Sequence, residues 1–90
     1  MAELLREYPN LVGGVDDTAY VAQVWASEMS DGRWEAWTLF VPVTSGQARR
    51  TERDTTQANR AAVEYWASRV TSIYLQGALA RSRPARMSAA

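Results

Sequence analysis

The sequence predicts an α+β fold, in which an antiparallel sheet of about three strands is followed by one long or two short C-terminal helices packed on one face. Residues 33–43, RWEAWTLFVPV, form the most aromatic and β-prone run of the chain and indicate the central strand. Asp31-Gly32 directly precedes this run and is typical of a hairpin turn. With 90 residues the chain has room for one hydrophobic core, so we expect a single domain over residues 1–80.

The first predicted strand covers residues 18–29, where alternate residues point to two different faces. A two-residue turn would place Val24 opposite Leu39 in the next strand. A three-residue loop, with Gly32 in the left-handed conformation, would place Val24 opposite Thr38 instead. We favour the three-residue loop, because the shorter turn would set two glutamates directly opposite each other.

The segments outside this hairpin give weaker signals. Residues 2–8 form either a short strand or one helical turn. Residues 48–53 are expected to return as a short third strand, whose arginines protect a sheet edge. The hydroxyl and amide side chains of Thr55-Thr56-Gln57 mark the expected start of a helix.

The helical region has an apolar stripe that changes direction along its length. Val63, Trp66, Ala67 and Val70 recur with the spacing of one helix face. The stripe then shifts, so we expect a break or kink near residues 69–72. Residues 81–90 lack periodicity and contain a proline, and we expect a disordered tail there.

The central strand is apolar on both faces, whereas the helices of so small a domain can cover only one of them. We therefore expect the second face to be exposed or paired with another chain, unless the N-terminal segment folds over it. Tryptophan, tyrosine and arginine are enriched at interface hot spots, and this chain has four Trp and four Tyr. The candidate interaction residues are Trp25, Trp34, Trp37, Leu39, Phe40 and Val41.

A second candidate site is the arginine-rich region around the expected helix start. Free backbone N–H groups and the helix dipole favour an anion at such a position. Arginines beside exposed tryptophans also suggest nucleic acid, but no recognition motif accompanies them and the formal net charge is zero. Helix capping, with Asp54 paired to a nearby arginine, explains the same residues. The candidate anion-binding residues are Arg49, Arg50, Arg53, Thr55, Thr56, Gln57 and Arg60.

The composition excludes many kinds of catalytic and metal site. The chain has no cysteine and no histidine, and all ten basic residues are arginine. Disulfides, thiol nucleophiles, the usual zinc ligands and Schiff-base lysines are therefore absent. The remaining carboxylates, hydroxyls and guanidinium groups form no mechanism that we recognise, so we expect no enzyme activity, no cofactor and no metal.

Charge and hydropathy bear on partners and location. Residues 1–35 carry two arginines and seven acidic residues, whereas residues 36–90 carry eight arginines and three acidic residues. This asymmetry suits either an acidic partner or a self-complementary dimer, although part of the positive excess lies in the expected tail. No apolar run is long enough to span a membrane and no signal peptide is visible, so we expect a cytoplasmic protein.

Four stretches together resemble a family of small uncharacterised bacterial proteins: DGRWEAW at residues 31–37, the junction at residues 49–57, EYWA at 64–67 and YLQGAL at 74–79. The resemblance covers residues 20–81. It implies one compact αβ domain and names no activity and no site residue. From the residues themselves we expect an interaction or self-association module, most simply a homodimer, with anion or nucleic-acid binding as the alternative.

Overall fold

The loop of residues 30–32 closes the hairpin on which the sheet is built. The computed structural model describes residues 1–14 and 16–85. β3 (Ala19–Glu28) pairs antiparallel with β4 (Trp34–Pro42), and Val24 lies opposite Thr38. Gly32 has a φ of 88°, in the left-handed region. The predicted three-residue loop and its register are therefore confirmed.

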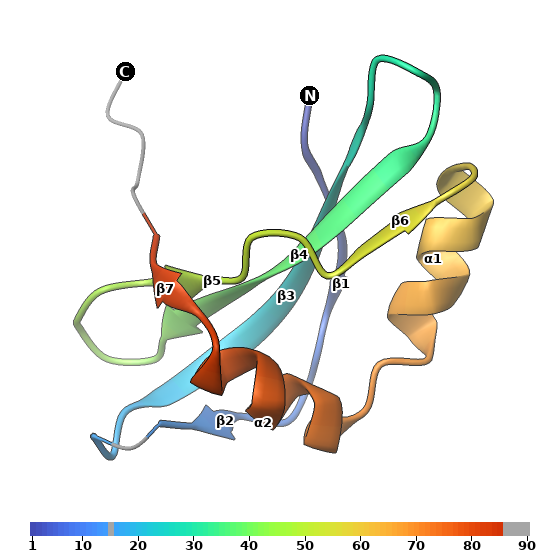
Figure 1. The fold of residues 1–90 in the computed structure, drawn as a ribbon. Helices are drawn as coiled ribbons and strands as arrows, with labels where there is room; N and C mark the ends of the chain where they lie inside the picture. Colours follow the sequence, from blue (N-terminus) through green and yellow to red (C-terminus); the bar gives the residue numbers. More distant parts are fainter. Residues whose placement is uncertain (15, 86–90) are drawn as a thin grey trace.

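The predicted number of strands is wrong, because the antiparallel sheet has seven (Figure 1). β1 and β2 both pair with the outer edge of β3, β5 and β6 both pair with β4, and β7 pairs with β5. β5 lies within the third strand predicted over residues 48–53, and β1 lies within residues 2–8, for which a strand is one of the two expectations. The sequence gives no strand signal for β2, β6 and β7, which have only two or three residues each, too few for an alternating pattern to reveal them. Their bounds are β1 (Glu3–Glu7), β2 (Val12–Gly13), β5 (Arg49–Arg50), β6 (Thr55–Gln57) and β7 (Arg83–Pro84).

Residues 49–57 follow β4 as one interrupted strand. Between β5 and β6 the regular strand pairing is interrupted, but two backbone hydrogen bonds to β4 remain. The Thr51 N–H donates to the Thr38 carbonyl at 3.0 Å, and the Asp54 N–H donates to the Ala36 carbonyl at 2.8 Å. The Thr51 hydroxyl accepts from the Thr38 N–H at 2.9 Å and so replaces a missing ladder bond. The effect resembles a β-bulge, because the detour turns Asp54 toward the helices.

The helix starts later than the sequence predicts. Thr55–Gln57 is strand β6, opposite Trp34, Glu35 and Ala36. α1 (Arg60–Ser68) begins after Asn59, whose side-chain oxygen accepts from the Ala62 N–H at 2.8 Å. Threonine suits a strand as well as a cap, and here pairing with β4 decides between them. The expected start at Thr55 is therefore wrong.

The predicted break between two helices is confirmed. α1 ends at Ser68, and α2 (Ser72–Ala80) starts after Thr71. The Thr71 hydroxyl caps α2 by accepting from the Tyr74 N–H at 3.1 Å. Both helices pack on the same side of the sheet and bury small and aliphatic residues there, namely Val63, Ala67, Leu75, Ala78 and Leu79.

The start of the predicted disordered tail also needs correction. Residues 81–85 continue the fold, because β7 pairs with β5 and the Ala85 N–H donates to the Ala48 carbonyl at 2.8 Å. Pro84 is tolerated because β7 is an edge strand, where one missing N–H breaks few ladder bonds. Ala85 is 5% exposed. The remainder of the predicted tail, residues 86–90, lies outside the described residues.

The domain has two layers, with helices on one side of the sheet only (Figure 1). Alternate residues are buried against the helices from Tyr20 to Ala26 in β3 and from Ala36 to Phe40 in β4, and Val24 and Phe40 are 0% exposed. The N-terminal segment extends the sheet edge as β1 and does not cross its other face. Tyr8, just after β1, donates its hydroxyl to the Ala67 carbonyl at 2.6 Å and ties this edge to α1.

Candidate interaction surface

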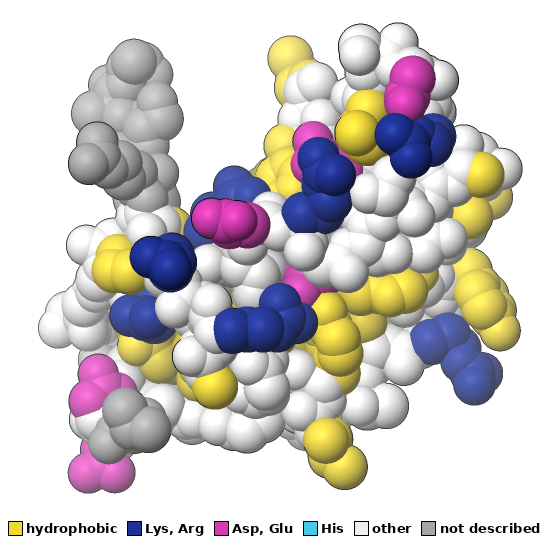
Figure 2. Space-filling model, in the orientation of Figure 1, with side chains coloured by type: hydrophobic (Ala, Val, Ile, Leu, Met, Phe, Trp, Pro, Cys, Tyr) yellow, Lys and Arg dark blue, Asp and Glu magenta, His cyan; other side chains and the backbone are white. Residues whose placement is uncertain are grey.

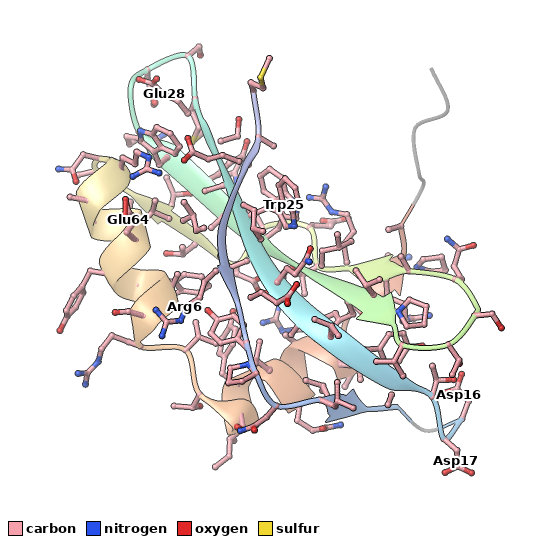
Figure 3. All side chains as sticks on the ribbon, turned by 180° about the vertical axis from the view of Figure 1, so that it is seen from behind. Arg6, Asp16, Asp17, Trp25, Glu28 and Glu64 are labelled. Carbon is pink, nitrogen blue, oxygen red and sulfur yellow. The ribbon has the colours of Figure 1, made fainter. Side chains whose placement is uncertain are left out.

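The side of the sheet turned away from the helices carries a continuous set of side chains that we call the open face. Figure 3 views the molecule from this side, with Trp25 over the middle of the sheet. Its members come from four strands and are half-buried or exposed. They are Leu4, Glu7, Val21, Gln23, Trp25, Ser27, Glu35, Trp37, Leu39, Val41 and Arg50.

An apolar belt crosses the centre of the open face. Leu4 lies opposite Trp25, and Trp25 lies opposite Trp37, so that the belt runs from β1 through β3 to β4. Leu4 is 45% exposed. Cross-strand aromatic and aliphatic pairs of this kind stabilise the sheet itself, but they also present apolar surface to the outside.

Polar contacts fix the orientation of both indoles. Trp25 donates its Nε1–H to the Gln23 side-chain oxygen at 2.9 Å, and Gln23 in turn donates to Glu7 at 2.8 Å. The guanidinium carbon of Arg50 lies 4.6 Å from the centroid of the Trp37 ring, a cation–π contact. Contacts within the chain therefore hold both indoles in place.

The structure brings together four of the six predicted interaction residues. Trp25, Trp37, Leu39 and Val41 share the open face. Trp34 and Phe40 do not, because they occupy even positions of β4 and point to the helices; Phe40 is fully buried. The alternation of the strand already places these two on the opposite side from Trp37, so they do not belong to the same surface as the other four.

Sequence reasoning left out Leu4 and Val21 from the interaction residues. The signal for Val21 was available, because the alternation of residues 18–29 places it on the same side as Trp25. Leu4 had no such signal, since the segment before Pro9 read equally well as a strand or a helical turn. Only pairing with β3 places it in the belt.

The predicted anion site is not assembled as expected at a helix N-terminus. Thr55, Thr56 and Gln57 lie in β6, and the arginines contact groups within the chain. Arg49 donates to the Ser82 hydroxyl and carbonyl, and Arg50 donates to the carbonyls of Thr51 and Glu52. Arg53 pairs with Glu35, and Arg60 pairs with Glu3 and Glu64.

Figure 2, on the helix side, shows arginine side chains gathered over the middle of the face with acidic side chains among them.

A polar network around Asp54 lies between the sheet and the helices. Its side chain is 0% exposed. One carboxylate oxygen accepts from the hydroxyls of Thr38 at 3.0 Å and Thr51 at 2.5 Å, and the other accepts from the Tyr74 hydroxyl at 2.7 Å and from Arg81 at 2.8 Å. The expected pairing of Asp54 with an arginine therefore occurs, but with Arg81, far along the chain, and without a capping role.

The network sets the protonation of its members. Burial opposes charge on Asp54, but hydrogen bonds from Thr51, Tyr74, Arg81 and Thr38 outweigh it and hold the pKa of the carboxyl below its ordinary value. Burial and the adjacent Asp54 raise the pKa of Tyr74 to about 12. All four positions around the carboxylate are occupied, so this site fastens α2 to the sheet and has no open coordination position.

Searches against family models, curated proteins and solved structures found no match to this chain. The resemblance to a bacterial family thus stays a prediction. In residues 1–14 and 16–85 no helix is long and apolar enough to cross a membrane. Nor does this part of the chain bring together three acidic side chains that could hold a metal ion.

Proposed function

We propose that this protein is a small non-catalytic interaction module that self-associates as a homodimer through the open face. The observation that carries the proposal is the belt of Leu4, Trp25 and Trp37, which no described segment covers. Burying such a belt removes apolar surface from water, and tryptophan with adjacent arginine is the combination enriched at the centres of interfaces. A domain of 90 residues has a small core of its own and gains stability from a partner.

The order of charges on the open face favours a second copy as the partner. Glu7, Gln23, Leu39 and Arg50 form one row across four strands, with the acid at one end and the base at the other. A two-fold axis parallel to the strands, between β3 and β4, would set Glu7 of each copy opposite Arg50 of the other. Packed sheets lie about 10 Å apart, a gap that these two long side chains can bridge together.

The shape of the domain supplies enough area for this contact. The Cα trace measures 39 × 33 × 19 Å, so the molecule is a flat slab with the sheet forming one broad side. A stable interface needs roughly 800 Å² per partner. The same axis would place Trp25 of one copy against Trp37 of the other, at the centre of the contact. The indoles are already held by Gln23 and Arg50, which lowers the entropy cost of binding.

Sedimentation velocity tests the proposal with a matched pair of variants. Leu4→Glu places a charge in the belt, whereas Ile73→Glu makes the same kind of change on α2, where Ile73 is 87% exposed. We expect the unmodified protein to sediment as a dimer at roughly 10 μM. Leu4→Glu should weaken dimerisation by about tenfold or more, and Ile73→Glu should leave it unchanged.

Two results would count against the proposal. One is an unmodified protein that remains a monomer up to about 100 μM. The other is equal weakening by both variants, which would place the contact elsewhere. Circular dichroism of each variant checks that the fold is retained.

The alternative of nucleic-acid or anion binding by Arg49, Arg50, Arg53 and Arg60 has less support. Two of these guanidinium groups, those of Arg53 and Arg60, are already paired with carboxylates within the chain. The formal net charge of zero also gives a polyanion no long-range attraction.

A further inference from the structure

A small cleft opens on the helix side of the domain, at the end of the sheet opposite the hairpin loop. Its volume is about 290 Å³. In Figure 1 this is the lower part of the molecule, where β2, the start of β3 and α2 come together. The lining residues are Gly13, Gly14, Asp16, Tyr20, Arg49, Gln76, Leu79 and Ala80. The cleft lies away from the open face, so a ligand could bind there whether or not the protein dimerises.

The hydroxyl of Tyr20 distinguishes this cleft from a packing defect. Tyr20 is 5% exposed, and its ring packs edge-on against Phe40 with centroids 6.4 Å apart. The hydroxyls of Tyr8 and Tyr74 have partners within the chain, whereas that of Tyr20 has none among the described residues. Tyr20 lines the cleft, and among the described residues nothing competes with a ligand for its hydroxyl.

Opposite charges line the cleft together. Arg49 is anchored by two hydrogen bonds to Ser82, which leave further guanidinium N–H groups for a ligand. The Asp16 carboxylate accepts a hydrogen bond from the Thr18 N–H at 3.2 Å. This contact with Thr18, together with the positive charge of Arg49, lowers the pKa of Asp16. The two side chains do not form an ion pair with each other within 4.0 Å in the described structure. A small ligand with one negative and one positive charge would pair with both Arg49 and Asp16.

The rest of the wall is apolar or lacks side chains. Leu79 and Ala80 supply apolar surface from α2. Gln76 donates to the Gly13 carbonyl at 2.7 Å and holds the glycine segment beside the helix. A Cβ at Gly14 would lie 3.3 Å from the Tyr20 ring and 3.0 Å from Asp16, so a side chain there would fill the space next to the hydroxyl.

We propose that this cleft binds a free α-amino acid with an apolar side chain. The carboxylate of the ligand accepts hydrogen bonds from Arg49 and the Tyr20 hydroxyl, its ammonium group donates to Asp16, and its side chain packs on Leu79 and Ala80. The cleft is close to the lower limit for small-molecule sites, roughly 300 Å³, which suits a ligand of this size. A few placed polar groups on an apolar wall are the usual composition of such a site.

NMR titration of the ¹⁵N-labelled protein tests the proposal. The probes are leucine, valine, methionine and phenylalanine, each added to about 20 mM, a range that detects millimolar binding. We expect at least one to shift the amide signals of Gly13, Gly14 and Leu79 in a saturable manner. The matching N-acetyl amino acid lacks the ammonium charge and the matching amide lacks the carboxylate, and both should bind at least about fivefold more weakly.

Two variants separate the proposed contacts from the fold. Tyr20→Phe keeps the ring against Phe40 and removes only the hydroxyl, so it should weaken binding by about five- to tenfold. Tyr65→Phe makes the same change on a side chain that is 66% exposed on α1 and should have no effect. Asp16→Asn should weaken binding of the free amino acid but not of its N-acetyl form.

The proposal is overturned if none of the four amino acids shifts these signals. It is equally overturned if the N-acetyl form binds as tightly as the free amino acid, or if Tyr20→Phe binds as tightly as the unmodified protein. Because dimerisation is measured separately by sedimentation, failure here leaves the homodimer proposal standing, and the reverse also holds.

Discussion

Asp54 joins the sheet to the second helix through one buried carboxylate. Its carboxylate contacts Thr38 in β4, Thr51 in the interrupted strand, Tyr74 in α2 and Arg81 just after α2. No local pattern predicts these contacts, because three of the four partners lie 16 or more residues away. From the sequence, an aspartate followed by two threonines reads as a helix cap, and only the tertiary fold assigns it to the network.

Replacing Asp54 should cost far more stability than replacing an exposed acid. Asp54→Asn leaves Arg81 without its counter-charge and cannot accept all four hydrogen bonds, so we expect a loss of about 2–4 kcal/mol in the free energy of unfolding. Glu64→Gln removes an exposed ion pair on α1 and should change it by less than about 0.5 kcal/mol. Urea unfolding at pH 7 gives both values. Similar losses in the two variants would contradict the role given to the network.

The same carboxylate should contribute to acid unfolding. Its pKa is lower in the folded than in the unfolded state, so its stabilisation is present above the ordinary aspartate value of about 3.9 and is lost as the pH falls below it. Urea unfolding between pH 5 and about 2 should therefore show a shallower fall in stability for Asp54→Asn than for the unmodified protein.

At the scale of elements, the sequence predicted the long hairpin, a short third strand and the helix break, but not the strands β2, β6 and β7. The hairpin has a local cause, since Gly32 takes a left-handed conformation that few other residues tolerate. The helix break likewise follows from the shift of the apolar stripe and the Thr71 cap. β2, β5 and β7 have two residues each and are defined by pairing with β3, β4 and β5, respectively.

Two glycine substitutions should have opposite effects on stability. Gly32→Ala forces a side chain into a φ of 88° and should destabilise the domain by about 1 kcal/mol. Gly77→Ala lies in α2, with nothing within 4 Å of the added Cβ, and should stabilise it by about 0.5–1 kcal/mol because alanine favours the helix. Thermal unfolding monitored by circular dichroism gives the sign of each change. If both substitutions shift the melting temperature in the same direction, one of the two backbone assignments is incorrect.

At the scale of the whole molecule, the defining feature is a sheet with helices on one side only. The sequence predicted both apolar faces of β4 and the presence of one uncovered face, because alternation in long strands is a strong signal. It did not predict the charge order across the face. Glu7 and Arg50 come to opposite ends of one row only through the pairing of β1 and β5 with the central hairpin.

The most direct test of the homodimer and of its axis is a charge exchange between Glu7 and Arg50. With the proposed axis, Glu7→Arg sets two pairs of arginines against each other, and Arg50→Glu sets two pairs of glutamates. We expect each variant alone to dimerise about tenfold more weakly than the unmodified protein. An equimolar mixture should recover the dimer, since each copy then meets the opposite charge on the other. Sedimentation equilibrium that shows no recovery on mixing, or no weakening of either variant alone, would contradict the account.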